Sequence, residues 1–263
     1  MATFQLVTSP HPFVAEIFAK RHLPLESGGT TPLDVYIPPE QGNFLYSLIR
    51  HYRPAVTVEI GMANGLSTLF ITSAHADNGA GGRHIAIDPF QSTDWRNIGV
   101  GLIRLAGLEK FCRLVELPSH QALPDLEREG VRAGLVFIDG SHLFDYVMAD
   151  FLCVDRILDV GGLMVFDDSD WPAVRPVIRY AVTNRHYTVA HPDVAIEAPP
   201  GRVSLAAKVL RAVARAIPAF GSRLRPSFLV PDEEMGLNGR CIVLRKEAEE
   251  DRDSQQIRNH QDY

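Results

Sequence analysis

The chain has 263 residues, of which 46% are apolar and 22% are charged, and its formal net charge is −6 at pH 7. These values are ordinary for a globular domain with a sizeable core, and they disfavour a protein built to neutralise a nucleic-acid backbone. No apolar run approaches the roughly 18 residues that span a bilayer, and the N-terminal residues do not resemble a signal peptide. The three cysteines, Cys112, Cys153 and Cys241, are far apart in apolar surroundings. Reduced thiols of this kind predict a cytoplasmic location.

From residue 54 onward, strand-like and helix-like segments alternate with short connections. Strands are predicted at 55–60, 84–88, 111–117, 134–139, 162–168, 186–190 and 240–245. Helices are predicted near 65–76, 93–106, 119–129, 143–158 and 171–184. The central strands are continuous apolar runs, as expected for strands covered on both faces. This order predicts an α/β fold with a doubly wound, mostly parallel seven-stranded sheet, and Gly161-Gly162 predicts the end of the 143–158 helix.

Other segments lie outside this alternation. Residues 1–50 are expected to form an N-terminal helical cap, with an amphipathic helix starting near Glu40, and residues 51–246 to form the ligand-binding domain. Residues 192–238 are expected to be an insertion before the last strand. The charged tail 247–263 has the composition of a disordered segment.

The insertion contains an amphipathic, basic stretch at 202–217, with Lys208, Arg211 and Arg215 away from its apolar positions. Three interpretations stay open for this stretch. It could pack on the domain with a solvated basic face, form a lid over a substrate pocket, or dock on a membrane surface or a partner.

A glycine turn follows the first predicted strand. In VEIGMANGLST (58–68) the glycines are spaced Gly61-x-x-x-Gly65, and the next strand ends at Asp88. Strand, glycine turn, helix, strand and acid are an arrangement that holds a nucleoside, with the acid accepting from the ribose hydroxyls. The structural alternative is a tight strand-to-helix connection without a ligand. The dinucleotide fingerprint G-x-G-x-x-G and the phosphate loop G-x-x-x-x-G-K-[ST] are both absent.

The candidate nucleoside-binding residues come from both segments. They are Glu59, Gly61, Ala63, Asn64, Gly65 and Ser67 in the first, and Asp88, Pro89 and Phe90 in the second.

Acidic residues end two later strands. Asp139 ends the fourth strand, and Asp167 and Asp168 end the fifth. The carboxyl ends of parallel strands open on one edge of the sheet, and neighbouring strands lie about 4.8 Å apart, so these acids are expected to converge. A raised pKa that keeps one acid protonated would relieve their repulsion, and so would a bound hard cation such as Mg²⁺, with Ca²⁺ or Mn²⁺ as alternatives. The alternative without a ligand is that the acids cap the following turn.

His142 lies three residues after Asp139 and is expected at the mouth of the same site. The unperturbed histidine pKa of about 6.5 suits proton abstraction at neutral pH. His142 is therefore a candidate general base, and Asp139 is the next candidate. The structural alternative is a histidine that only lines the pocket.

Taken with the first motif, E-x-G-x-A-x-G, three segments resemble a known family. DGSHxxDYVxxD (139–150), GGLMVFDD (161–168) and PEQGxFL (39–45) are similar to the metal-dependent O-methyltransferases of the class I S-adenosylmethionine-dependent fold. The likeness is strongest to the branch that methylates sugar hydroxyls, and weaker to catechol and caffeoyl-CoA O-methyltransferases. It covers roughly residues 37–190 and the last strand. One departure is Ala63, where many members carry glycine.

The resemblance implies a Rossmann-like methyltransferase fold with S-adenosylmethionine as cofactor. It implies that Asp139, Asp167 and Asp168 hold Mg²⁺ and that His142 serves as base. Asp88 would contact the ribose, Ser119 would lie near the adenine, and Asp139 would adjoin the cofactor.

The leading hypothesis is O-methylation of a small-molecule hydroxyl, such as one on a sugar or a vicinal diol. The alternatives are a metal-independent small-molecule methyltransferase and a non-catalytic cofactor-binding scaffold. A nucleic-acid substrate is not expected, because the chain is acidic and lacks an N/D-P-P-Y/F run. A homo-oligomer stays open.

Overall fold

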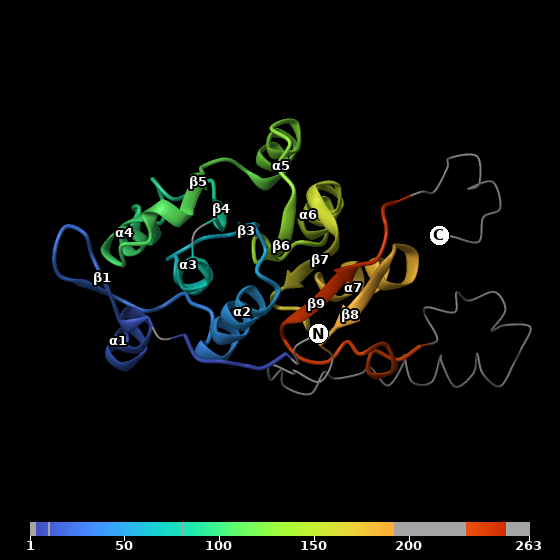
Figure 1. Cartoon of the computed structure of the whole chain (residues 1–263), viewed down its shortest axis with the longest axis horizontal. Coiled ribbons are helices and arrows are strands. Elements are labelled where there is room, and N and C mark those ends of the chain that lie inside the picture. Colours follow the sequence, from blue (N-terminus) through green and yellow to red (C-terminus); the bar gives the residue numbers. More distant parts are fainter. Residues whose placement is uncertain (1–3, 10, 80, 192–229, 251–263) are drawn as a thin grey trace, which may run out of the picture.

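The central sheet has seven strands in the order β5-β4-β3-β6-β7-β9-β8, with helices on both faces (Figure 1). The computed structural model describes residues 4–9, 11–79, 81–191 and 230–250. The predictions made for the 202–217 stretch and for most of the 247–263 tail therefore lie outside the described residues.

The strands of this sheet are β3 (Val56–Ile60), β4 (Arg83–Ile87), β5 (Cys112–Val115), β6 (Ala133–Ile138), β7 (Leu158–Phe166), β8 (Tyr187–Ala190) and β9 (Ile242–Lys246). The helices are α1 (Pro12–Lys20), α2 (Pro39–Tyr52), α3 (Leu66–Asn78), α4 (Ile98–Leu105), α5 (Ser119–Arg128), α6 (Phe144–Ile157) and α7 (Arg175–Asn184). Two 3₁₀ turns, η1 (Glu109–Phe111) and η2 (Glu233–Met235), and a small antiparallel hairpin, β1 (His22–Pro24) and β2 (Thr30–Pro32), complete the described elements.

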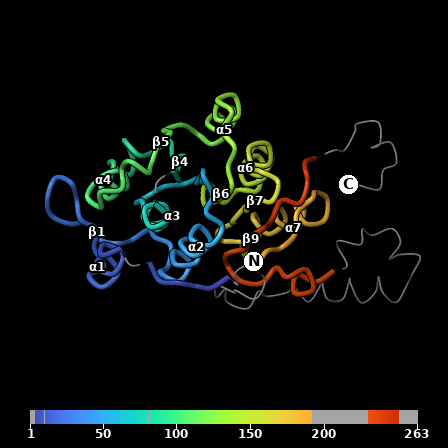
Figure 2. Tube along the Cα trace, in the orientation of Figure 1, coloured from blue at the N-terminus to red at the C-terminus, as the bar shows by residue number. Residues whose placement is uncertain are grey.

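The strands β5, β4, β3, β6 and β7 run parallel to one another, whereas β9 runs antiparallel to both β7 and β8. Figure 1 and Figure 2 show β4 and β5 on one side of the molecule, and β9, drawn in red, on the other. The predicted doubly wound, mostly parallel seven-stranded sheet is confirmed.

The strand register aligns the carboxyl ends of the central strands. Ile60 of β3 lies opposite both Ile87 of β4 and Ile138 of β6, and Ile138 lies opposite Phe166 of β7. The residue that follows each strand therefore emerges at the same edge of the sheet.

Two apolar clusters cover the two faces of the sheet. One joins β-strand side chains to α1, α2, α3 and α4, and the other joins them to α5, α6 and α7. The helix α2, which was expected within an N-terminal cap, belongs to the first cluster. A Cβ on Gly42 of α2 would lie 2.1 Å from the Phe70 ring of α3, so glycine permits this close helix contact.

Several predicted boundaries were wrong. The pair Gly161-Gly162 does not end a helix, because α6 ends at Ile157 and β7 begins at once at Leu158. The pairing of β7 with β6 shifts between Ala133 and Leu135, and Gly161 adopts φ +83°. Glycine is frequent at such irregularities within strands, so these glycines mark an irregular strand start.

The helix predicted at 93–106 starts only at Ile98, after a run of turns. Arg96 and Asn97 both adopt positive φ, which interrupts a helix. The helix predicted at 171–184 likewise starts later, at Arg175, with a proline in its first turn.

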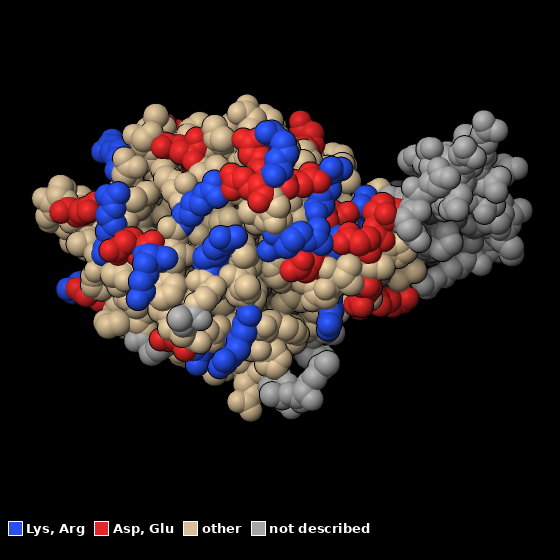
Figure 3. All heavy atoms as spheres, turned by 45° about the horizontal axis from the view of Figure 1, so that its top comes forward, with Lys and Arg blue, Asp and Glu red and all other residues tan. Residues whose placement is uncertain are grey.

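Acidic and basic side chains are interspersed on the surface shown in Figure 3. Exposed ion pairs of the described residues include Arg113 with Glu129 and Arg156 with Glu127. No helix in the described part of the chain is long and apolar enough to cross a membrane.

A buried polar chain runs through the centre of the first face. His75 Nε2 of α3 lies 2.8 Å from Thr57 Oγ1, which lies 2.9 Å from His84 Nδ1. His84 Nε2 in turn lies 3.1 Å from Glu59 Oε1, which also accepts a hydrogen bond from Thr68. Burial lowers the pKa of His75 to about 4, and the nearby His84 adds to the effect.

The lowered pKa of His75 should make stability fall in acid. As pH drops below the unfolded histidine pKa of about 6.5, His75 becomes protonated in the unfolded chain but stays neutral in the folded chain until about pH 4. The free energy of unfolding should therefore lose roughly 2–3 kcal/mol more in wild type than in His75→Gln between pH 7 and pH 4. Urea unfolding of both proteins at several pH values measures this difference, and parallel pH curves would contradict it.

Candidate functional site

The site lies at the carboxyl edge of the sheet, where backbone hydrogen bonds between neighbouring segments continue for one residue beyond the strands. Gly61 N–H donates to Ile87 O at 2.9 Å, Asp139 N–H donates to Ile60 O at 2.9 Å, and Asp167 N–H donates to Ile138 O at 3.0 Å. These bonds fix the backbone of the glycine turn and of both acidic motifs before any side chain is considered.

The glycines of the turn serve the packing of the protein itself. A Cβ on Gly61 would lie 2.1 Å from Asp139 O, and one on Gly65 would lie 2.8 Å from Gly99 Cα at the start of α4. Both residues have positive φ, and so does Ala63 at +46°. Ala63 thus occupies a conformation that glycine adopts more easily.

A cavity of about 420 Å³ opens between the glycine turn and the loops after β4, β5 and β6. Its size falls within the range of sites for small molecules and cofactors. The predicted residues that line it are Gly61, Ala63, Asp88, Pro89, Phe90, Ser119 and Asp139. Sequence reasoning missed Trp95, His120 and Tyr146, which also line it. His120 adjoins Ser119, and Tyr146 lies within the 139–150 motif, so a signal existed for both.

Asp88 is only 3% exposed and joins the glycine turn to the loop after β4. Its Oδ2 accepts hydrogen bonds from Ala63 N–H at 2.8 Å and from the Gln91 amide at 3.2 Å, and its Oδ1 accepts from Phe90 N–H at 2.9 Å. A carboxylate oxygen can accept more than one hydrogen bond, so Oδ1 retains capacity for a ligand hydroxyl.

A second cavity of about 160 Å³ adjoins the first, and both are lined by Gly61, Ala63 and Asp139. The predicted residues found only in this second cavity are Asn64, Ser67, His142, Asp167 and Asp168. Asn64 and Ser67, both expected to bind the nucleoside, therefore lie on the side of the glycine turn that faces the acids. The lining also includes Arg240, Tyr36 and Met62, none of which was predicted to have a role.

Glu59 lines neither cavity, because its side chain is fully buried in the polar chain with His84 and Thr68. Gly65 lies at the N-terminus of α3 against α4. Glu59 and Gly65 thus contact other parts of the protein and line neither cavity.

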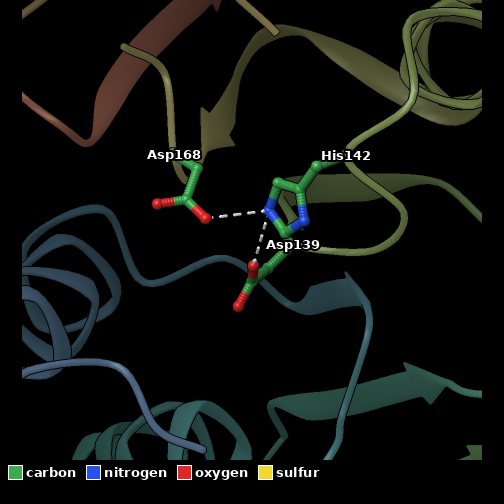
Figure 4. Close-up of side chains that lie close together, drawn as sticks. All are labelled: Asp139, His142 and Asp168. Atoms are coloured by element: carbon green, nitrogen blue, oxygen red, sulfur yellow. Dashed lines mark ion pairs between the residues drawn. The ribbon is translucent and has the colours of Figure 1, made fainter. Parts of the chain in front are cut away.

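Asp139, His142 and Asp168 form a close cluster (Figure 4). His142 Nε2 lies 3.0 Å from Asp168 Oδ2 and 3.6 Å from Asp139 Oδ1. Pairing with Asp139 and Asp168 raises the pKa of His142 to about 10. In this arrangement the imidazole is protonated at neutral pH.

The carboxylates of the cluster differ from one another. Burial raises the pKa of Asp139, and the charges of Asp167 and Asp168 add to this effect. Burial likewise raises the pKa of Asp167, with the Asp168 charge as the second cause. Burial opposes ionisation of Asp168, but His142 and Arg240 outweigh it and hold its pKa below the usual value.

Two residues missed by sequence reasoning flank Asp167 and Asp168. Arg240 Nη2 lies 2.8 Å from Asp168 Oδ1, and its Nε lies 3.6 Å from Asp167 Oδ1. The fully buried Gln41 side chain of α2 favours the ionised form of Asp167, although neither of its polar atoms completes a hydrogen bond. Gln41 belongs to the PEQGxFL segment, so a sequence signal existed for it, whereas Arg240 had none.

The donor set fits a divalent cation. One ligand atom each from Asp139, His142 and Asp168 can be chosen so that all three lie within 4.8 Å of one another. Carboxylate oxygens suit Mg²⁺ or Mn²⁺, and imidazole favours Mn²⁺ or another transition metal over Mg²⁺. Asp167, expected as a third acidic ligand, lines the same cavity, and its Oδ1 accepts the backbone N–H of Asp168 at 2.7 Å.

Comparison with known proteins agrees with this geometry. A family model described as a methyltransferase domain matches residues 58–169. Caffeoyl-CoA O-methyltransferase of Stellaria longipes is 26% identical over 151 residues, which cover 56% of this chain and 57% of that protein. Flavonoid 3',5'-methyltransferase of Vitis vinifera is 26% identical over 140 residues, covering 51% of this chain and 56% of that protein. The chain thus spans little more than half the length of these relatives.

Solved structures share the fold. The O-methyltransferase TomG of Streptomyces achromogenes, in complex with SAM, superposes with a TM-score of 0.51 at 22% identity, covering 60% of this chain and 74% of that one. The family model and the curated relatives make this chain similar to methyltransferases, O-methyltransferases among them, and the solved structures share its fold.

Proposed function

We propose that this protein transfers a methyl group from S-adenosylmethionine to a hydroxyl of a small molecule, with a divalent cation at the acidic cluster. The observation that carries the proposal is the pair of adjoining cavities. The larger has the size of a nucleoside site and contains Asp88, the smaller contains the acids and His142, and Gly61, Ala63 and Asp139 line both. Such a junction would bring a methyl donor and an acceptor into contact.

The larger cavity suits the cofactor. Asp88 Oδ1 would accept a hydrogen bond from a ribose hydroxyl, and Ser119 and His120 would lie beside the adenine. The start of α3, with Ser67, would face the charged amino-acid end of the cofactor. Support comes from the SAM complex of TomG, which has the same fold.

The smaller cavity suits the acceptor. S-adenosylmethionine supplies an electrophilic methyl group when bound, and a divalent cation would lower the pKa of an acceptor hydroxyl. Asp139, Asp168 and either His142 or Asp167 would hold that cation. Where Asp167 is the third ligand, His142 would remove the acceptor proton through Nε2, provided that Asp139 and Asp168 no longer stabilise its protonated form. Asp139 is the next candidate, because its raised pKa brings it closer to that of a neutral-pH base.

For the acceptor we propose a small molecule with neighbouring hydroxyls, such as a sugar or another vicinal diol. The relatives named for caffeoyl-CoA and flavonoid methylation support a hydroxyl acceptor in general. A cytoplasmic enzyme, alone or as a homo-oligomer, is part of the same proposal, and the free cysteines Cys112, Cys153 and Cys241 fit it.

One observation favours a metal-independent methyltransferase as the second candidate. Protonated His142 and Arg240 already supply two positive charges next to the three carboxylates. A cluster balanced in this way has less need of a cation.

The first prediction concerns the cofactor cavity. Asp88→Ala should weaken S-adenosylmethionine binding by roughly 10- to 150-fold, the equivalent of one hydrogen bond to a charged acceptor at about 1.5–3 kcal/mol. Isothermal titration calorimetry measures the loss, and Asp94→Ala, which removes an exposed acid from the same loop, should bind as wild type does. NAD(H) should not bind. An unchanged affinity in Asp88→Ala would remove the residue from the cofactor site.

The second prediction concerns the cation. Loss of a residue that only hydrogen-bonds to a metal ligand weakens metal binding roughly 10- to 100-fold. Asp168→Asn would change a ligand itself, so it should weaken Mn²⁺ binding by more than that. Mn²⁺ titration followed by electron paramagnetic resonance measures this, with Asp145→Asn, an exposed acid of α6, as the control. Turnover should also stop in excess EDTA. Full turnover there would favour the metal-independent candidate.

The third prediction concerns the base. His142→Gln should lower the rate of methyl transfer by about 10²- to 10⁴-fold if the imidazole accepts the proton. Affinity for S-adenosylmethionine should change little, because His142 does not line the larger cavity. Single-turnover kinetics with a diol acceptor, together with calorimetry, separates the two effects. A near-normal rate would leave His142 as a residue that only lines the pocket and would direct attention to Asp139.

A further inference from the structure

Arg240 is held beside the acidic cluster by the backbone as well as by charge. Ser169, which follows the two acids, donates its N–H to Arg240 O at 2.8 Å and its hydroxyl to Gly239 O at 3.0 Å. Ser169 is fully buried, and Cys241 on the other side of Arg240 is 3% exposed. The loop before β9 is therefore fixed to the acidic loop after β7, and the guanidinium starts from an anchored backbone.

The guanidinium approaches the same carboxylate that belongs to the candidate cation site. Asp168 Oδ1 lies 2.8 Å from Arg240 Nη2, while Asp168 Oδ2 lies 3.0 Å from His142 Nε2. Both oxygens of Asp168 thus face positive groups. Within the described residues, the buried Arg240 Nε makes no hydrogen bond. Its ion-pair partner is Asp167 Oδ1, at 3.6 Å.

The charge of Arg240 is permanent. Arginine stays protonated throughout the physiological pH range, and only 38% of this side chain is exposed, so solvent screens its charge only partly. A divalent cation bound to Asp168 would therefore share a carboxylate with a fixed positive group, and the two cations would repel each other.

We propose that Arg240 is an internal counter-cation that competes with a divalent cation for Asp168 and thereby weakens cation binding at the Asp139–His142–Asp168 cluster. This inference rests on the cation site of the proposed function. Arg240, which lies outside the motifs found in the sequence, would thereby set the cation affinity and keep the acidic loop after β7 in place when no cation is bound.

The test is direct cation binding by the full chain. Mn²⁺ is titrated into wild type and Arg240→Gln without cofactor or acceptor, and free Mn²⁺ is followed by electron paramagnetic resonance. Arg240→Gln should lower the Kd for Mn²⁺ about tenfold, within the roughly 5- to 150-fold range typical of coupling between two ligands. The matched control is Arg245→Gln, which removes the same charge from β9 at a position paired with Leu163, away from the acidic loop. That control should bind Mn²⁺ within about twofold of wild type.

Circular dichroism confirms that each variant is folded, and Arg240→Met, which keeps the aliphatic part of the side chain, replaces Arg240→Gln if the amide unfolds the loop. Tighter Mn²⁺ binding in the Arg240 variant alone supports the inference, even where wild type binds too weakly to measure. Unchanged or weaker binding in the Arg240 variant, with binding in wild type, overturns the inference but leaves the cation site in place. Absence of binding in all variants overturns both the inference and the cation part of the proposed function.

Discussion

The aligned ends of four parallel strands are the constraint on which the rest of the site depends. Ile60, Ile87, Ile138 and Phe166 stand opposite one another in the register. Each next residue, which is Gly61, Asp88, Asp139 or Asp167, leaves the sheet at the same edge. Backbone hydrogen bonds extend beyond the strands to hold Gly61, Asp139 and Asp167. The apolar clusters on both faces fix the register, because a shift by one residue would turn buried side chains toward the opposite face.

The glycine turn links the two cavities because it is packed so tightly. Gly61 touches the backbone of Asp139, and the Ala63 N–H binds the Asp88 carboxylate. One short segment is thereby tied to the acid of the larger cavity and to an acid of the smaller one. Asp88 consequently has a structural role in addition to any contact with a ligand. A change in the conformation of the turn would alter both cavities.

Electrostatics in the smaller cavity are balanced by groups from distant parts of the chain. His142, which follows β6, lies close to Asp139 and Asp168, and Arg240, which precedes β9, lies close to Asp167 and Asp168. Burial, with repulsion among the carboxylates as an additional cause, raises the pKa values of Asp139 and Asp167, whereas His142 and Arg240 outweigh burial and lower the pKa of Asp168. The positive groups therefore balance the carboxylates in the absence of a cation, and the same carboxylates offer the oxygen atoms that the proposed cation would need.

Continuous apolar runs and glycine turns are local signals, and they predict the order of strands and helices, the parallel sheet and the edge at which Asp88, Asp139, Asp167 and Asp168 emerge. The prediction was wrong at Gly161-Gly162, because an irregular strand and a helix end can have the same composition. Other features depend on tertiary packing: Glu59 is buried in the core, Ser67 and Asn64 lie on the acidic side of the turn, and His142 lies close to both Asp139 and Asp168. Arg240 is the clearest case. Arg240 is far from Asp168 in the sequence, and it reaches that acid because β9 pairs with β7. Contacts of that kind depend on which strands become neighbours, and local sequence patterns do not contain that information.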